Sequence, residues 1–269
     1  MSSVDEFRAR ARATWVAGDW DKFSTLIAPI GELVLKRAEV EPGMRLLDVG
    51  TGSGGNIAIP AARLGATVIG ADLTPELFVH ARSRAEAAAV EVEWVEADAQ
   101  DLPFADGSFD RVISTFGAMF APDHARAAAE LVRVCAAGGR IVMTTWVNDG
   151  FAGELFKLSG SVMPPPPAGV QTPPMWGLAD HVESMFQAAR AKPTTTVETV
   201  EFGFASVEAA VQTYGEQFGP FVMVHSVLGS EERWNEFLSR FDALVRRFNT
   251  ATDGTARIHS SYFVISIDR

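Results

Sequence analysis

A glycine-rich turn between two apolar segments constrains this chain more than any other feature. The apolar run at 44–49 predicts a buried strand, and the glycines at 50–55 form a turn that opens a helix near Asn56. A second apolar run ends at Asp72, twenty residues after Gly52. Glycines allow torsions and close ligand approach that side chains would prevent, and a carboxylate at a strand end accepts hydrogen bonds from a ribose diol. The pattern therefore predicts a βαβ unit that binds a nucleoside.

Two classes of cofactor fit this turn. Gly50, Gly52 and Gly55 match the G-x-G-x-x-G pattern of enzymes that bind dinucleotides. With Gly54 as the third glycine, the same turn matches the G-x-G-x-G pattern of methyltransferases. Asp48 lies two residues before the first glycine, where its charge would repel a bound pyrophosphate. S-adenosylmethionine has no phosphate there, and its ammonium and sulfonium groups favour negative charge, so Asp48 favours this cofactor over NAD.

Three more strands are predicted after the βαβ unit. The segment 92–98 predicts a third strand that ends in an acid, and 108–116 predicts a fourth. The segment 130–140 predicts a helix that stops at a pair of glycines. A fifth strand is then predicted at 141–146.

This succession of elements closely resembles the class I S-adenosylmethionine-dependent methyltransferases over residues 44–146, particularly the ubiquinone/menaquinone-biosynthesis-like branch that acts on small molecules. The resemblance implies an α/β fold with a Rossmann-like, seven-stranded, mostly parallel sheet, helices on both faces and an antiparallel last strand. It also implies S-adenosyl-L-methionine as the cofactor and S-adenosyl-L-homocysteine as its product. The sulfonium methyl is already activated, so the implied reaction is an in-line displacement that depends on alignment and exclusion of water.

The resemblance assigns cofactor contacts to the ends of the strands. Asp72 would bind the ribose hydroxyls, with Leu73 against the adenine, and Asp98 would bind the adenine amine. Each residue alone has a structural alternative, because Asp98 could cap a turn and Phe116 could belong to the core. The other implied contacts come from the turn, from the ends of the strands and from the N-terminal helices, and are Asp48, Gly50, Thr51, Gly52, Ala99, Ser114, Thr115, Phe116 and Trp20.

Two histidines are candidates for a catalytic base, although no base is assigned. His124 stands at a predicted helix start near the functional edge of the sheet, where the alternative is an exposed residue. His225 follows the apolar run 221–224, where the alternative is an interior histidine with its hydrogen bonds satisfied. No group of His, Cys and Asp has metal-ligand spacing, so we expect the transfer to be independent of metal.

Composition limits the partners and the compartment. The net charge of −11 disfavours a nucleic acid acceptor and leaves a small-molecule acceptor. Cys135 is the only cysteine, so no internal disulfide can form. No apolar run is long enough to span a bilayer, and the sequence at 1–6 lacks the regions of a signal peptide. We therefore expect a cytoplasmic protein, as a monomer or a homodimer.

The segments around the core predict covers for the active site. We expect an N-terminal helical cover at 1–40, a cofactor-binding core at 41–147 and a helical, proline-rich cap segment at 148–192. Residues 193–269 would hold the last two strands, at 194–204 and 262–267, with a helical insertion at about 206–250. An insertion of this length exceeds a simple connection, so we expect it to roof the acceptor pocket.

The sequence thus predicts an enzyme that moves a methyl group to O, N or C of a small, apolar or aromatic metabolite. One alternative is an enzyme of this fold that binds the cofactor but catalyses another reaction, such as a cyclisation, because the cofactor residues would be the same. A non-catalytic binding module is a further alternative, although it would not need Asp72 and Asp98.

Overall fold

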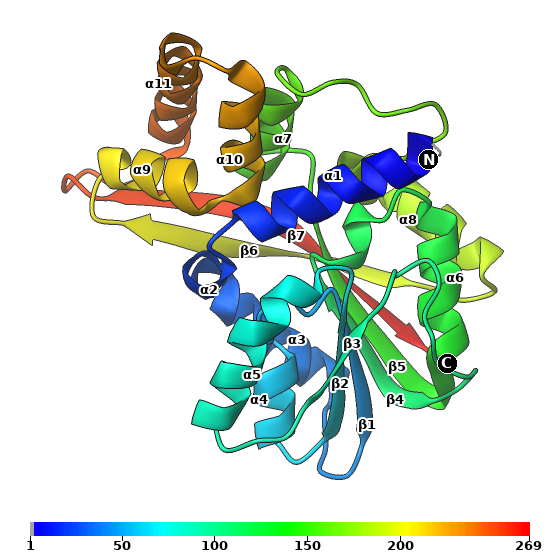
Figure 1. Ribbon diagram of the computed structural model, residues 1–269. Helices are drawn as coiled ribbons and strands as arrows, with labels where there is room; N and C mark the ends of the chain where they lie inside the picture. The colour runs from blue at the N-terminus through cyan, green and yellow to red at the C-terminus, as the bar shows by residue number, and fades with distance from the viewer. Residues whose placement is uncertain (1–2) are drawn as a thin grey trace.

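The computed structural model describes the backbone of residues 3–269 and the side chains of residues 9–269. Its centre is a seven-stranded sheet with the order β3-β2-β1-β4-β5-β7-β6 (Figure 1). The first five strands are parallel, whereas β7 is antiparallel to both β5 and β6. The predicted fold class is therefore confirmed. The strands are β1 (Arg45–Val49), β2 (Thr67–Asp72), β3 (Glu93–Glu96), β4 (Phe109–Thr115), β5 (Cys135–Trp146), β6 (Thr194–Phe204) and β7 (Ala256–Asp268).

Helices pack on the sheet and above the carboxyl ends of its parallel strands (Figure 1). Those of the first half are α1 (Ser3–Ala17), α2 (Trp20–Phe23), α3 (Ala28–Ala38), α4 (Ala58–Arg63), α5 (Phe78–Ala87) and α6 (His124–Val134). Those of the second half are α7 (Phe151–Gly160), α8 (Ala179–Ala188), α9 (Val207–Gln217), α10 (Gly219–Leu228) and α11 (Glu231–Phe248). Short 3-10 turns lie at Ser24–Ile27, Pro75–Leu77, Ala118–Phe120 and Pro173–Gly177. None of the helices described is long and apolar enough to cross a membrane.

The last two strands form a ribbon that extends beyond β5. Pairing of β5 with β7 begins at Tyr262, whereas β6 pairs with β7 from Ala256 onward. The predicted start of the last strand at Tyr262 was therefore wrong by six residues, because the alternating polar segment before it pairs with β6 and not with β5. Figure 1 shows α7 and α9–α11 gathered over this ribbon, with α1 running from α10 across the top of the sheet.

Local sequence signals define the helices above the ribbon. The Ser206 side chain accepts a hydrogen bond from the Ala209 N–H and begins α9. A proline at its first turn starts α10, which ends at Gly229 with a φ of 68°. Ser230 caps α11 in the same way as Ser206 caps α9. These helices occupy the insertion predicted at about 206–250.

Cys135 lies in a strand and not in the helix predicted at 130–140. Helix α6 ends at Val134, and Cys135 pairs with Phe109 as the first residue of β5. The register between β4 and β5 then shifts before Arg111 pairs with Arg140. Cys135 is fully buried, and burial raises the pKa of its thiol to about 11. The side chain is thus a small core residue.

Candidate functional site

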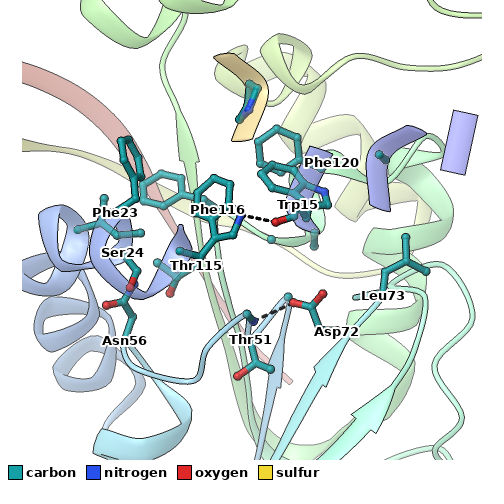
Figure 2. Close-up of a pocket in the computed structure, with 18 of the residues that line it drawn as sticks. Trp15, Phe23, Ser24, Thr51, Asn56, Asp72, Leu73, Thr115, Phe116 and Phe120 are labelled. Atoms are coloured by element: carbon teal, nitrogen blue, oxygen red, sulfur yellow. Dashed lines mark hydrogen bonds between the residues drawn. The ribbon is translucent and has the colours of Figure 1, made fainter. Parts of the chain in front are cut away.

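A cavity opens at the carboxyl ends of β1, β2, β4 and β5. One end is lined by the glycine turn and by acids, and the other by aromatic side chains from both sequence flanks. Figure 2 shows Thr51 and Asp72 on one side of this cavity and Phe23, Phe116 and Phe120 on the other. The segment between β1 and α4 therefore forms one wall of a cavity whose opposite wall comes from the helical covers.

The two central glycines of the turn serve different purposes. Gly50 has a φ of +75°, and a methyl group there would lie 2.5 Å from the Gly117 Cα. Gly52 has a φ of +55°, but a methyl group there would meet nothing within 4 Å. Both torsions favour glycine. Gly50 therefore allows two backbone segments to touch, whereas Gly52 leaves room in the cavity.

Asp72 holds the turn and also lines the cavity. Its Oδ2 accepts a hydrogen bond of 2.8 Å from the Gly52 N–H, and its Oδ1 accepts one of 2.8 Å from the Thr74 N–H. Burial raises the pKa of this carboxyl above its usual range, and the backbone donors oppose that rise. Each carboxylate oxygen has a second acceptor site, so Asp72 can receive hydroxyl groups from a ligand as well.

Asp98 caps a turn and also lines the cavity, whereas the sequence left the turn and the cofactor site as alternatives. Its Oδ1 accepts hydrogen bonds of 2.9 Å from both the backbone N–H and the side-chain amide of Gln100. Gln100 in turn accepts a hydrogen bond from the Asp123 N–H at 3.0 Å. Asp98, Ala99 and Gln100 all line the cavity. The turn therefore fixes the carboxylate at the cavity wall.

Asp48 and Ser114 lie behind the cavity wall and not on it. The Asp48 carboxylate is 2% exposed and accepts a hydrogen bond of 2.7 Å from the Thr51 hydroxyl, while burial raises its pKa to about 7. The Ser114 hydroxyl donates to the Val49 carbonyl and accepts from the Ala118 N–H, both at 2.8 Å. Buried polar groups need such partners, so these two side chains brace the turn from within. The other ten predicted cofactor contacts line the cavity: Gly50, Thr51, Gly52, Asp72, Leu73, Asp98, Ala99, Thr115, Phe116 and Trp20.

The aromatic end is built around a strained residue at the end of β4. Phe116 has a φ of +55°, which is unusual for a bulky side chain and typical of functional sites. Its ring stacks on Trp146 with centroids 4.0 Å apart and planes 7° apart. From the N-terminal cover, Trp20 donates a hydrogen bond of 2.6 Å to the Trp15 carbonyl, and the Trp15 ring packs edge-on against Phe120. These rings make one end of the cavity apolar.

Several lining residues at the aromatic end had no distinct signal in the sequence. They come from α7, β6 and α9 and from the segment between α9 and α10, where an aromatic residue at helical spacing looks like any core residue. They are Phe151, Phe156, Phe202, Tyr214 and Phe218.

Neither candidate histidine lines the cavity. His124 is fully buried, and its Nδ1 lies 2.9 Å from the His181 Nε2 on α8. His225 stacks on Trp234 at 4.6 Å, and its Nε2 lies 3.1 Å from the Glu231 carboxylate. Both side chains turn toward neighbouring helices instead of the cavity, so the structure gives neither a place beside an acceptor.

The burial of His124 predicts a loss of stability in acid. Burial first, and His181 second, lower the His124 pKa to about 4, although Asp123 opposes the shift. An unfolded histidine titrates near 6.5, so the unfolded state binds more protons between these values. The contribution to stability is complete above pH 6.5 and is lost as the pH falls toward 4. When the pH falls from 7.5 to 5.0, the free energy of unfolding measured in urea should decrease by about 2 kcal/mol less in His124→Asn than in the wild type. Equal decreases in the variant and the wild type would contradict the role of the buried His124 in acid sensitivity. The control is His80→Gln, because His80 is exposed.

Sequence comparisons identify relatives over the core and beyond it. A family model described as a methyltransferase domain matches residues 47–143. An uncharacterized protein of Mycobacterium tuberculosis is 45% identical over 177 residues, 65% of this chain and 64% of that protein, so the chain spans just under two thirds of this relative. A second such protein is 38% identical over 223 residues, 82% of this chain and 81% of the relative. The demethylmenaquinone methyltransferase of Thermus thermophilus is 39% identical over 134 residues, 48% of this chain and 61% of that enzyme.

Solved structures share the whole architecture. The YcgJ protein of Bacillus subtilis superposes with a TM-score of 0.60 at 21% identity, over 89% of this chain and 97% of that chain. A geranyl diphosphate methyltransferase in complex with S-adenosylmethionine superposes with a TM-score of 0.56 at 17% identity, over 90% and 85%. At these identities the likeness shows the fold alone. Together with the sequence matches, it shows that the chain belongs to the same family as these mycobacterial proteins and contains a methyltransferase domain with the fold of the class I S-adenosylmethionine-dependent methyltransferases.

Proposed function

We propose that this protein binds S-adenosylmethionine at the glycine end of the cavity and transfers its methyl group to O, N or C of a small, apolar or aromatic acceptor at the other end. The observation that carries the proposal is the continuity of the cavity, which joins Gly52 and Asp72 to the aromatic end without a break. One continuous cavity can therefore hold both reactants.

The glycine end fits the cofactor in shape and in charge. The space at Gly52 is open, and a side chain would fill it. In the proposed complex Asp72 accepts the ribose hydroxyls and Asp98 the adenine amine. Among the cavity-lining residues that the structure describes, Asp72 and Asp98 are the only ones with ionisable carboxyl groups, and none is lysine, arginine or histidine. Negative charge suits S-adenosylmethionine, whose ammonium and sulfonium groups outweigh its single carboxylate and leave a net positive charge.

The aromatic end fits a neutral acceptor. A carboxylate or phosphate there would lose water without gaining a cationic partner, which is costly in an apolar site. The rings align the acceptor and exclude water, and these are the main requirements of an in-line methyl transfer. The net charge of −11 further supports a small-molecule acceptor over a nucleic acid.

Calorimetric titration of the purified protein tests the cofactor. We expect micromolar affinity for S-adenosylmethionine and no binding of NAD, because among the described lining residues the carboxylates of Asp72 and Asp98 are not offset by any lysine or arginine and would repel a pyrophosphate. Binding of NAD alone would contradict the proposal. Acceptors are then screened by product mass, where the gain of one methylene group indicates methyl transfer. A product of unchanged mass would instead indicate the alternative chemistry, such as a cyclisation.

A further inference from the structure

Tyr214 on α9 is a polar residue inside an aromatic environment. It is 2% exposed and lines the aromatic end of the cavity. Its ring is held in place by aromatic neighbours whose centroids lie 5.0 to 6.2 Å from the centroid of Tyr214. The closest rings to Tyr214 are Phe241 at 5.0 Å, Phe23 at 5.1 Å and Phe218 at 5.4 Å. The phenol therefore has a fixed orientation.

The Tyr214 hydroxyl has hydrogen-bonding capacity that the described side chains leave unused. Within residues 9–269 no hydrogen bond to this hydroxyl is found. Packing does not enclose this oxygen completely, since it is absent from the fully buried polar atoms that lack a partner. Since the residue lines the cavity, a ligand in that space is the partner available to the hydroxyl. Burial raises the pKa of the phenol well above its usual range, so the group remains a neutral donor at physiological pH.

Other polar groups at this end are less suited to orient a ligand. The hydroxyls of Ser24 and Ser159 also line the cavity, but both residues are half-buried and each side chain turns about a single bond. Tyr214 is buried and held by rings on several sides. A donor that is fixed before binding orients a ligand without further loss of conformational freedom.

We propose that the Tyr214 hydroxyl donates a hydrogen bond to a hydroxyl, enol or carbonyl oxygen of a neutral aromatic acceptor and so positions it in the cavity. The inference rests on the proposed function, which places the acceptor at this end. It narrows the acceptor class to an aromatic ring that carries an oxygen substituent. Tyr214 is a specificity-determining residue in this assignment, and an apolar ring without the oxygen would leave its hydroxyl unpaired.

A pair of probe ligands tests this inference directly. Naphthalene and 1-naphthol have the same ring and differ in one hydroxyl, and the binding of each is followed by quenching of tryptophan fluorescence. We expect the wild type to bind 1-naphthol about fivefold more tightly than naphthalene, the effect of one net hydrogen bond. Tyr214→Phe keeps the packing ring and should reduce this ratio to about one, while its affinity for naphthalene is retained.

The second tyrosine of the chain provides a matched control. Tyr262 is 3% exposed but does not line the cavity, so Tyr262→Phe should keep the fivefold preference. The inference is overturned if the wild type shows no preference or binds neither probe, or if Tyr214→Phe keeps the preference. It is also overturned if both variants lose it equally. Titration with S-adenosylmethionine separates the two proposals, because Tyr214→Phe should bind it as the wild type does, whereas failure of the wild type to bind it would contradict the proposed function.

Discussion

Asp72→Asn is expected to weaken the binding of S-adenosylmethionine by about 100-fold, because two charge-assisted hydrogen bonds to the ribose would be lost. The substitution keeps the shape of the side chain but replaces one oxygen by an amide group. Both oxygens of Asp72 accept backbone N–H groups, from Gly52 and from Thr74. One of these donors would then face the amide N–H₂ of asparagine, so the turn itself would also be disturbed.

The matched control is Asp110→Asn at the opposite end of the sheet. Asp110 accepts a hydrogen bond of 2.8 Å from the Arg45 N–H and does not line the cavity. An asparagine can accept the same bond, so the affinity measured by calorimetry should stay within about twofold of the wild type. Thermal unfolding of both variants establishes that they are folded. Unchanged affinity in Asp72→Asn would contradict its role in the cofactor site.

The core of the fold could be predicted because its signals are local. The strands that end at Val49 and Asp72 are short apolar runs, and the glycine turn between them has few other uses in such a position. Ten of the twelve predicted cofactor contacts line the cavity for the same reason, since the ends of parallel strands meet at one edge. The sequence could not distinguish a residue that lines the cavity from one that lies behind the cavity wall, as Asp48 and Ser114 show.

The acceptor end could not be predicted because its residues come together only in the folded chain. Trp146, Phe202 and Tyr214 belong to three distant segments, and each has the pattern of an ordinary core residue. The direction of a side chain at a helix start is also not fixed by the sequence. His124 turns toward His181 on α8, more than fifty residues away, and not toward the cavity.

Gly50→Ala is expected to destabilise the protein by about 3 kcal/mol or more, the largest loss of stability predicted here for one added methyl group. A left-handed torsion costs a non-glycine residue about 1–2 kcal/mol, and forcing atoms into a packed site adds about 1–3 kcal/mol. The added methyl would lie 2.5 Å from the Gly117 Cα, a backbone atom that no side-chain rotation can move away. Urea unfolding followed by circular dichroism measures this loss.

Gly52→Ala is the comparison that separates packing from ligand contact. Its torsion carries the same cost of about 1–2 kcal/mol, but the methyl group would enter open space. We therefore expect Gly52→Ala to be more stable than Gly50→Ala by about 2 kcal/mol. Gly52→Ala should nevertheless bind S-adenosylmethionine at least tenfold more weakly than the wild type, because the methyl group occupies the cavity. Equal destabilisation of the two variants, or wild-type affinity in Gly52→Ala, would contradict this division. Two glycines that look equivalent in the sequence pattern thus have different reasons to be there, since Gly50 allows the contact of β1 with the segment after β4 and Gly52 leaves space for the cofactor.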